Sequence, residues 1–368
     1  MTVRVPLHLS RDASYDILID RGLLHELARL VARHCPARRY AVISDSHVAE
    51  LYGPTVMRVL KDGGLDAELY PFAAGEWNKT RDAWGALSDR MLEAQFGRDG
   101  AVLALGGGVV GDVAGFVAAT YYRGIPFVQL PTTLLAMVDS SIGGKTGVDT
   151  SRGKNLLGAF HQPRVVIADL DTLATLPAVQ LAAGMSEAIK HGVIADADYC
   201  ASLERDRDAV MGKERDPAAL ERLVTRSVEI KAAVVSADER EAGRRAFLNF
   251  GHTIGHAVEA TNGYAMLHGE AIAIGMALEA ALAERVGIAE RGTGAAIVHL
   301  LERFDLPVAL PGDARVDDLI AAMRHDKKRR GGDLHFALPR RIGEMCGDMR
   351  NGWTTAISED IVREVLGQ

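Results

Sequence analysis

The sequence predicts an N-terminal α/β domain over residues 1–176 and a C-terminal helical domain over residues 177–368. Between residues 40 and 130, short apolar runs alternate with helical patterns, which is typical of a parallel sheet covered by helices. After Pro177 the strand-like runs give way to a series of helical patterns. A length of 368 residues also fits two domains of ordinary size.

The strands of the first half are expected where apolar residues alternate or form short runs. Residues 3–9 and 15–19 alternate and are expected to form a hairpin. Later apolar runs are typical of buried parallel strands: residues 40–44, 67–72, 101–105, 127–130 and 165–168. Helices are expected between them, over residues 22–33, 47–63 and 81–96. The boundary of the domain is placed at residues 171–177.

The second half is expected to contain helices over residues 179–194, 217–237, 245–260, 269–286, 293–304 and 316–324. Three widely spaced cysteines, Cys35, Cys200 and Cys346, predict no disulfide framework and fit a reducing cytoplasm. The longest apolar run, residues 271–283, contains Glu279 and is too short to cross a bilayer. The N-terminus lacks the apolar segment of a signal peptide. A net charge of −7 disfavours general nucleic-acid binding but permits a local basic pocket for a small anion.

A glycine-rich turn, GGGVVGD at residues 106–112, follows the strand expected at residues 101–105 and matches the pattern G-x-G-x-x-G. Glycines let the backbone approach a pyrophosphate, and the N-terminus of the next helix favours its negative charge. Similar glycine-rich turns also serve packing. The support for a nucleotide-binding turn therefore comes from the alternation of strands and helices around residues 106–112. Asp45 is a candidate ribose contact, although it precedes the glycines instead of following them.

Residues 138–163 are expected to form a loop rich in glycine, hydroxyl groups and lysine. The GKT at residues 144–146 is not a P-loop, because the first glycine of that motif would fall at Asp139. Lys145, Lys154 and Asn155 suit a phosphate or a polyol. The alternative is a solvated turn, which accounts for single lysines but not for their combination with so many glycines.

Three histidines lie close together in the sequence, at His252, His256 and His268. His252 and His256 are four residues apart and would share one helix face. Neutral imidazole is the commonest metal ligand, whereas two core histidines bonded to backbone are the alternative. The sequence is not HExxH, so a zincin protease is not supported.

Charged residues also occur inside apolar helical patterns. Glu187 and Lys190 are three residues apart, and a buried pair of this kind is costly unless it binds something. An exposed pair at this spacing means little. Lys231 lies within another apolar helical pattern. The basic run at residues 324–330 is typical of a solvated loop.

Eight segments occur in an order that indicates one family. They are GEWNK, GGGVVGDVAGF, YYRGIPFVQLPTTLLAMVDSSIGGKTGVD, GKNLLGAFHQP, GMSEAIKHG, LNFGHTIGHAVEA, LHGEAIAIGM and HDKK. With them the chain resembles the 3-dehydroquinate synthases, among the sugar phosphate cyclases, over nearly its full length. The resemblance implies a Rossmann-like domain that binds NAD, a helical domain that holds Zn²⁺ or Co²⁺, and an active site in the cleft between them. It also implies a cytoplasmic homodimer that binds a small sugar phosphate and neither nucleic acid nor membrane.

The resemblance makes Glu187, His252 and His268 the metal ligands, and this replaces the pair His252 and His256 that spacing alone favoured. One carboxylate and two imidazoles with an open position also suit catalytic Zn²⁺. His256 becomes a proton-transfer or hydrogen-bonding group beside the substrate. The implied substrate ligands are Lys145, Asn155, Lys190, Lys231, Arg245, Asn249, and Lys327 or Lys328.

Further roles follow from the same resemblance. Arg123 would reach the substrate phosphate of a neighbouring subunit, and Asp139 and Glu241 are implied supporting carboxylates. The implied NAD-binding residues are Asp45, Glu76, Lys79, Gly107, Gly108, Val109, Val110, Gly111, Asp112, Thr132, Thr133, Lys145, Lys154, Thr172, Leu173, Ala174 and Thr175.

The implied reaction is the conversion of 3-deoxy-D-arabino-heptulosonate 7-phosphate to 3-dehydroquinate in the shikimate pathway. NAD⁺ takes a hydride and returns it after phosphate elimination, and ring opening and an intramolecular aldol follow. Sister cyclases accept substrates without the carboxylate, but Asn249 and the DKK at residues 326–328 match the dehydroquinate type. A metal-dependent polyol dehydrogenase would instead accumulate NADH, and a non-catalytic nucleotide-binding module would need no metal.

Overall fold

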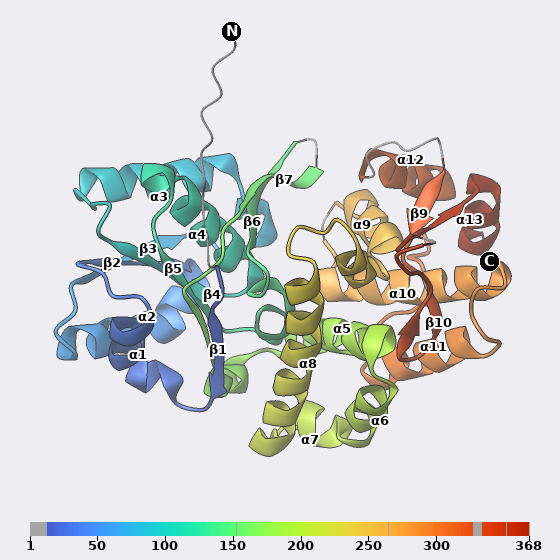
Figure 1. The fold of residues 1–368 in the computed structure, drawn as a ribbon, viewed down its shortest axis with the longest axis horizontal. Helices are drawn as coiled ribbons and strands as arrows, with labels where there is room; N and C mark the ends of the chain where they lie inside the picture. The colour runs from blue at the N-terminus through green and yellow to red at the C-terminus, as the bar shows by residue number, and fades with distance from the viewer. Residues whose placement is uncertain (1–12, 152, 264, 327–332, 351, 368) are drawn as a thin grey trace, which may run out of the picture.

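The computed structural model describes residues 13–151, 153–263, 265–326, 333–350 and 352–367. Its N-terminal half is built on one six-stranded sheet with strand order β1-β8-β5-β4-β2-β3, and every pairing in it is parallel. The sheet lies in the left half of Figure 1. Its strands are β1 (Asp16–Asp20), β2 (Tyr40–Asp45), β3 (Ala67–Phe72), β4 (Ala101–Gly106), β5 (Phe127–Pro131) and β8 (Val165–Asp169).

Helices cover both faces of this sheet, which explains why its central strands are apolar on both sides. One face packs against α1 (Leu27–His34) and α2 (Ser46–Asp62). The other face packs against α3 (Arg81–Glu93) and α4 (Gly108–Thr120). Short 3₁₀ helices complete this half: η1 (Leu23–Glu26), η2 (Glu76–Asn78), η3 (Tyr121–Arg123) and η5 (Leu170–Thr175).

The C-terminal half is mainly helical and occupies the right half of Figure 1. Its helices are α5 (Ala178–Ala195), α6 (Ala197–Arg205), α7 (Arg207–Met211), α8 (Pro217–Ala237), α9 (His252–Thr261), α10 (His268–Arg285), α11 (Thr293–Arg303), α12 (Val316–Asp326) and α13 (Glu359–Leu366), with the 3₁₀ helix η6 (Arg244–Asn249). The expectation of helices alone was incomplete. Four short strands form two antiparallel pairs: β9 (Leu334–Phe336) with β12 (Thr355–Ile357), and β10 (Pro339–Arg341) with β11 (Glu344–Met345).

The segment expected to be a loop, residues 138–163, is largely ordered into an antiparallel hairpin, so that prediction was wrong. Its strands are β6 (Lys145–Thr150) and β7 (Gly153–Phe160), and the short π-helix η4 (Ala136–Ser140) precedes them. Glycine permits the close approach of the two strands, because a Cβ at Gly158 would lie 2.2 Å from the carbonyl oxygen of Thr146. The hairpin rises between the two halves in Figure 1.

The single helix expected over residues 245–260 is broken between η6 and α9, which corrects a second prediction. Gly251 has φ 80°, a left-handed conformation that ends the first segment and starts α9 at His252. A Cβ at Gly251 would lie 2.5 Å from Cγ of Met276 on α10. The break therefore lets α9 pack closely on α10 and places His252 at the first residue of a helix.

The expected N-terminal hairpin is described only in part, because residues 3–9 lie outside the described residues. The second strand is present as β1, at the edge of the main sheet beside β8.

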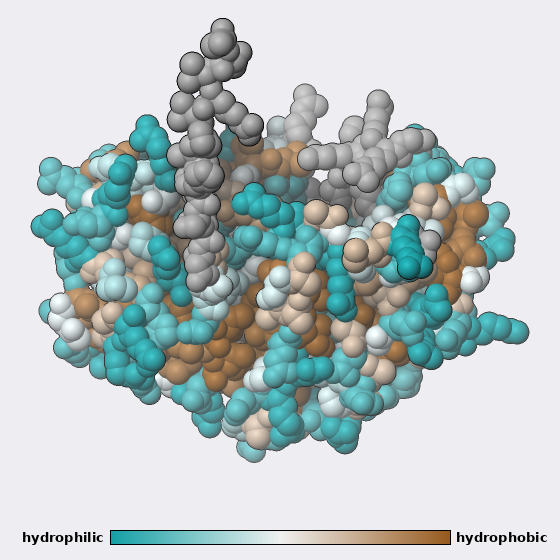
Figure 2. Space-filling model, in the orientation of Figure 1, coloured by the Kyte–Doolittle hydropathy of each residue, from teal (hydrophilic) through white to brown (hydrophobic). Residues whose placement is uncertain are grey.

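Apolar side chains gather on the face shown in Figure 2, around the region of β1 and α8. No helix in the described part of the chain combines the length and apolarity needed to cross a membrane.

The two halves share an apolar core. Leu134 and Met137, which belong to the first half, pack in one cluster with Met185 and Ile189 of α5 and with residues of α8. This shared core holds η4 and α5 against each other. The division at residues 176 and 177 remains a prediction, and it falls between η5 and α5.

Candidate active site

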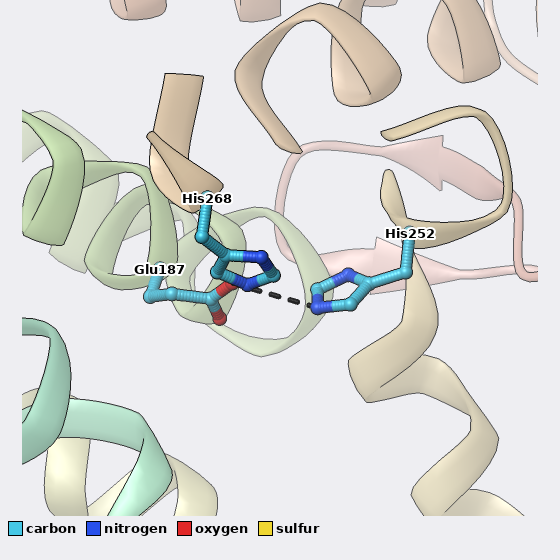
Figure 3. Close-up of side chains that lie close together, drawn as sticks. All are labelled: Glu187, His252 and His268. Atoms are coloured by element: carbon cyan, nitrogen blue, oxygen red, sulfur yellow. Dashed lines mark ion pairs between the residues drawn. The ribbon is translucent and has the colours of Figure 1, made fainter. Parts of the chain in front are cut away.

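Glu187, His252 and His268 come from three different helices and point toward one another, as Figure 3 shows. Oε1 of Glu187 on α5 lies 3.6 Å from Nε2 of His252, at the start of α9. The same oxygen lies 3.7 Å from Nε2 of His268, at the start of α10. One ligand atom from each residue lies within 4.8 Å of the others. The three residues are therefore arranged as a metal site would require.

The second nitrogen of each imidazole faces an acceptor. Nδ1 of His252 lies 3.2 Å from the carbonyl oxygen of Phe250, and Nδ1 of His268 lies 3.2 Å from Oε1 of Glu259. A carbonyl can only accept, and so can an ionised carboxylate, so both Nδ1 atoms are assigned as donors. Metal-binding histidines are held in this way, with one nitrogen donating to the protein and the other facing the ion.

Glu187 is fully buried, and its Oε1 has no hydrogen-bond partner among the described residues. Burial alone would raise the pKa of Glu187, but Lys190, whose ammonium contacts the carboxylate, outweighs it and lowers the pKa. A buried ionised carboxylate with an unsatisfied oxygen is costly unless a cation compensates it. The residues present thus fit a divalent cation.

The two histidines differ in protonation. Burial and the ammonium of Lys190 hold the pKa of His252 well below its usual range, so this imidazole is neutral. Burial would also lower the pKa of His268, but the carboxylates of Glu259 and Glu187 outweigh it and raise the pKa to about 10. A cation that binds here must therefore displace a proton from His268.

Two further groups of metal-binding side chains overlap this one: His256, Glu259 and His268, and Asp139, Glu187 and His191. Both are less suited to an ion. Oε1 of Glu259 already lies 3.0 Å from Nζ of Lys154, and Oδ1 of Asp139 lies 2.6 Å from Nζ of Lys231. His256 is nevertheless near the centre, since its ring centroid lies 5.1 Å from that of His252.

A buried group of lysines surrounds Asp139 beside Glu187. Lys231 on α8 donates to Oδ1 of Asp139 at 2.6 Å and to its backbone oxygen at 2.5 Å. Nζ of Lys190 lies 3.9 Å from the same carboxylate. Burial would raise the pKa of Asp139, but Lys231 and Lys190 hold it well below its usual range. Burial lowers the pKa of Lys231 to about 8, against the opposing effect of Asp139.

A second polar group lies at the base of the β6–β7 hairpin. Lys145 forms an ion pair with Glu241, and the side-chain nitrogen of Asn249 donates to the other oxygen of Glu241 at 2.6 Å. Arg245 is buried and donates to the carbonyl oxygen of Gly143 at 3.1 Å. These contacts join β6 of the first half to η6 of the second.

The residues assigned to the cofactor collect at the carboxyl ends of the parallel strands, where α/β sheets bind nucleotides. Asp45 ends β2, where it caps α2 by accepting from the backbone N–H groups of His47 and Val48 at 2.9 Å. Most of the other expected positions follow the ends of β4, β5 and β8: Gly107, Gly108, Val109, Val110, Gly111 and Asp112 after β4, Thr132 and Thr133 after β5, and Thr172, Leu173, Ala174 and Thr175 in η5.

A buried lysine connects the glycine turn to the hairpin. Nζ of Lys79 lies 2.5 Å from Oδ2 of Asp112 and 2.6 Å from Oδ1 of Asn155. Asn155 was expected beside the substrate, yet the structure places its side chain against these cofactor-side residues. Nζ of Lys154, also on β7, lies 3.1 Å from Oε1 of Glu76.

Three expected site residues are not placed in these groups by the described part of the structure. Lys327 and Lys328 fall outside the described residues. Arg123 is exposed and follows the C-terminal end of α4. A helix of 13 residues is about 20 Å long, so Arg123 is distant from the glycine turn at the other end of α4.

Sequence reasoning missed several residues that support the site. His191 lies between Ser227 and Asp139, with its Nδ1 2.6 Å from Oγ of Ser227. Glu259, three residues after His256, is paired with His268 and Lys154. Glu279, which interrupts the apolar run of α10, accepts from the backbone N–H groups of Gly251 and Ile254. A carboxylate in an apolar helical pattern was the available signal for both glutamates.

Comparison with known proteins gives matches along most of the chain. Two family models match, "3-dehydroquinate synthase N-terminal" over residues 69–183 and "3-dehydroquinate synthase C-terminal" over residues 184–329. A curated 3-dehydroquinate synthase from Symbiobacterium thermophilum is 50% identical over 351 residues, which are 95% of this chain and 96% of that protein.

Solved structures with the same fold include two cyclases that are each 29% identical to this chain. A 2-epi-5-epi-valiolone synthase from Streptomyces hygroscopicus, with NAD⁺ and Zn²⁺ bound, has a TM-score of 0.88 and matches over 98% of both chains. A 2-deoxy-scyllo-inosose synthase in complex with carbaglucose-6-phosphate, NAD⁺ and Co²⁺ has a TM-score of 0.87 and matches over 95% of both chains.

Proposed function

We propose that this chain, which belongs to the 3-dehydroquinate synthase family, converts 3-deoxy-D-arabino-heptulosonate 7-phosphate to 3-dehydroquinate and phosphate at the residues around Glu187. It is an NAD- and divalent-metal-dependent enzyme. We place the active site here because His252 and His268 converge on Oε1 of Glu187, which has no hydrogen-bond partner among the described residues. Zn²⁺ and Co²⁺ both fit one carboxylate and two imidazoles.

Glu187, His252 and His268 would hold the metal ion, and the strand ends and the glycine turn would hold NAD. When bound, the ion supplies a Lewis acid for a substrate hydroxyl and NAD⁺ supplies a hydride acceptor that is regenerated within the cycle. Glu187 is buried on α5, and His252 and His268 begin α9 and α10. The three ligands are therefore carried by helices that pack against one another. The protein thereby fixes where on the substrate this chemistry takes place.

Lys145, Lys190, Lys231 and Arg245 suit a substrate that carries both a phosphate and a carboxylate. Arg245 and Lys190 are almost fully buried, and buried cations attract anions more strongly than solvated ones. Asp139 and Glu241 keep the lysines in place before the substrate arrives, because each carboxylate is paired with a lysine. Asn249 orients Glu241 through its side-chain nitrogen.

We assign proton transfer or hydrogen bonding at the substrate to two residues, Lys231 and His256. Burial lowers the pKa of Lys231 to about 8, which puts it close to the working range of an acid or base. The ring of His256 lies beside that of His252, at 5.1 Å between centroids. We assign His256 to proton transfer or hydrogen bonding at the substrate.

The assembly and location of the enzyme are further parts of the proposal. Arg123 is exposed and distant from the glycine turn of its own chain, which supports a homodimer in which it reaches the substrate phosphate of the neighbouring subunit. Residues 1–176 form the NAD-binding domain and residues 177–368 the metal-binding domain. The few cysteines, all of them free, support a cytoplasmic enzyme. The proposed reaction places the enzyme in aromatic amino acid biosynthesis.

The decisive experiment incubates the purified protein with NAD⁺, Zn²⁺ or Co²⁺ and the heptulosonate phosphate. Phosphate release and nicotinamide absorbance are followed together. A synthase releases phosphate in many turnovers without net NADH, whereas a polyol dehydrogenase accumulates NADH with its product. Turnover of substrates that lack the carboxylate, in preference to the heptulosonate, would indicate a sister cyclase instead.

A further inference from the structure

We propose that Glu259 is a positioning residue for the metal ligand His268. Its carboxylate accepts the Nδ1 proton of His268 and so turns Nε2 toward Glu187. The inference rests on the proposed metal site, and it assigns a role to a carboxylate that is neither a ligand of the ion nor a contact of the substrate.

The geometry at His268 separates the roles of its two nitrogens. Nδ1 lies 3.2 Å from Oε1 of Glu259, and Nε2 lies 3.7 Å from Oε1 of Glu187. The imidazole of His268 therefore lies between two carboxylates, those of Glu259 and Glu187. Only Glu187 also faces His252. Because Glu259 holds the proton side of the ring, the lone pair of the neutral imidazole is presented at Nε2.

His252 provides an internal comparison, since its Nδ1 faces a backbone carbonyl, that of Phe250. A carboxylate acceptor carries a full charge and raises the basicity of the imidazole more than a neutral carbonyl does. The two histidines of the site are thus supported unequally. The stronger support falls on His268, which is also the more exposed of the two, with side-chain exposures of 32% and 13%.

The burial of Glu259 indicates that its charge has a role other than stabilising the fold. The residue is 1% exposed, and its Oε2 has no hydrogen-bond partner among the described residues. Buried ionic groups of this kind are often no more stabilising than a well-packed apolar residue. A charge at this position is explained if it orients the ligand next to it.

Lys154 connects this support to the cofactor side of the site. Its Nζ lies 3.0 Å from Oε1 of Glu259 and 3.1 Å from Oε1 of Glu76. Lys154 is on β7 and Glu76 is on η2, both in the first half of the chain. The ammonium compensates the charge of Glu259 and prevents that oxygen from serving as a ligand, because a second cation at the same atom would be repelled.

Substitution of Glu259 tests the inference through metal binding instead of turnover alone. Co²⁺ affinity is measured by chelator competition and by the visible absorption of the bound ion. We expect Glu259→Gln to fold and to bind Co²⁺ about 10- to 100-fold more weakly, with a changed spectrum, as when outer partners of metal-bound histidines are removed. Glu259→Asp should recover part of the affinity.

Two controls separate orientation from general damage. Glu284→Gln makes the same change on α10, where the carboxylate accepts from the backbone of Gly294, and its Co²⁺ affinity should stay within about twofold because distant sites act independently. Lys154→Met removes the other contact of Oε1 and should not weaken Co²⁺ binding. If Lys154→Met and Glu259→Gln lost Co²⁺ affinity equally, metal binding would depend on the ion pair between these residues and not on the orientation of the His268 imidazole.

Nitrogen chemical shifts of His268 in the Zn²⁺-loaded wild-type protein show which ring nitrogen binds the metal. They test the inference even if Glu259→Gln does not fold. The inference requires a protonated Nδ1 and a metal-bound Nε2. A metal-bound Nδ1, or unchanged Co²⁺ affinity and spectrum in Glu259→Gln, would overturn it while leaving the proposed function intact. Failure of the wild-type protein to bind an ion at all would overturn the metal site itself.

Discussion

The carboxyl edge of the sheet and the helical group around Glu187 build their parts of the site in different ways. At the sheet edge, the site is formed mainly by the backbone, because strand ends, a glycine turn and a helix N-terminus lie in one row. Few charged side chains are buried there. Around Glu187, the site consists of buried charged side chains from α5, α8, α9 and α10. The first region is fixed by topology and tolerates polar surroundings, whereas the second depends on each charge having its partner.

This difference predicts that single substitutions are most damaging in the helical group. His268→Ala should lower activity by at least about 1,000-fold with loss of the ion, because Lewis-acid stabilisation is worth several kcal/mol. NAD binding, measured by fluorescence titration, should be retained because the sheet edge is untouched. Full turnover of the wild-type enzyme after exhaustive chelation would refute the metal assignment.

The converse substitution is at the glycine turn. A Cβ at Gly107 would lie 3.1 Å from Cγ2 of Thr133, in the space next to the turn. Gly107→Ala should weaken NAD binding by roughly tenfold, or about 1.4 kcal/mol, and leave Co²⁺ affinity unchanged. If metal binding fell together with NAD binding, the two regions would not be as independent as we describe.

The pH dependence of kcat/KM should report on Lys231. Its pKa of about 8 lies below that of an ordinary lysine because of burial. If the charged form binds the anionic substrate, kcat/KM falls above about pH 8, since the ammonium loses its proton there. Lys231→Arg keeps a charge that does not titrate in this range, so the alkaline limb should disappear or move upward. A limb that stays at the same pH in Lys231→Arg would assign it to another group.

The smallest effect is expected for the carboxylate that holds the start of α9. Glu279 accepts from Gly251 at 2.8 Å and from Ile254 at 3.0 Å, and Glu279→Gln can keep only one of these bonds. The free energy of unfolding should fall by about 1–3 kcal/mol, the cost of an unsatisfied buried group. Urea denaturation measures it, with exposed Glu302→Gln on α11 as the matched control. No loss of stability would mean that α9 is held by packing on α10 alone.

Much of the fold was predictable because its determinants are local. The parallel strands read as short apolar runs, and β3 (Ala67–Phe72) and α8 (Pro217–Ala237) have the predicted bounds. The glycine turn and the strand ends follow from the same pattern, since parallel strands bring their carboxyl ends to one edge. Polar segments were harder: residues 138–163 lack the apolar alternation of a strand, yet glycines at positions such as Gly158 allow them to pair.

The sequence by itself determined the fold class, the family and the types of residue available for a metal, NAD and an anionic substrate. The resemblance implied that Glu187, His252 and His268 act together, but only the tertiary structure shows how their three helices bring the ligand atoms together, with the ring of His256 beside that of His252. It also showed that Glu259 and Glu279 hold the two histidine-bearing segments. The physical reason is that helical periodicity records which face of a helix is buried. It does not record which other helix that face meets, and this depends on close contacts such as Gly251 against Met276.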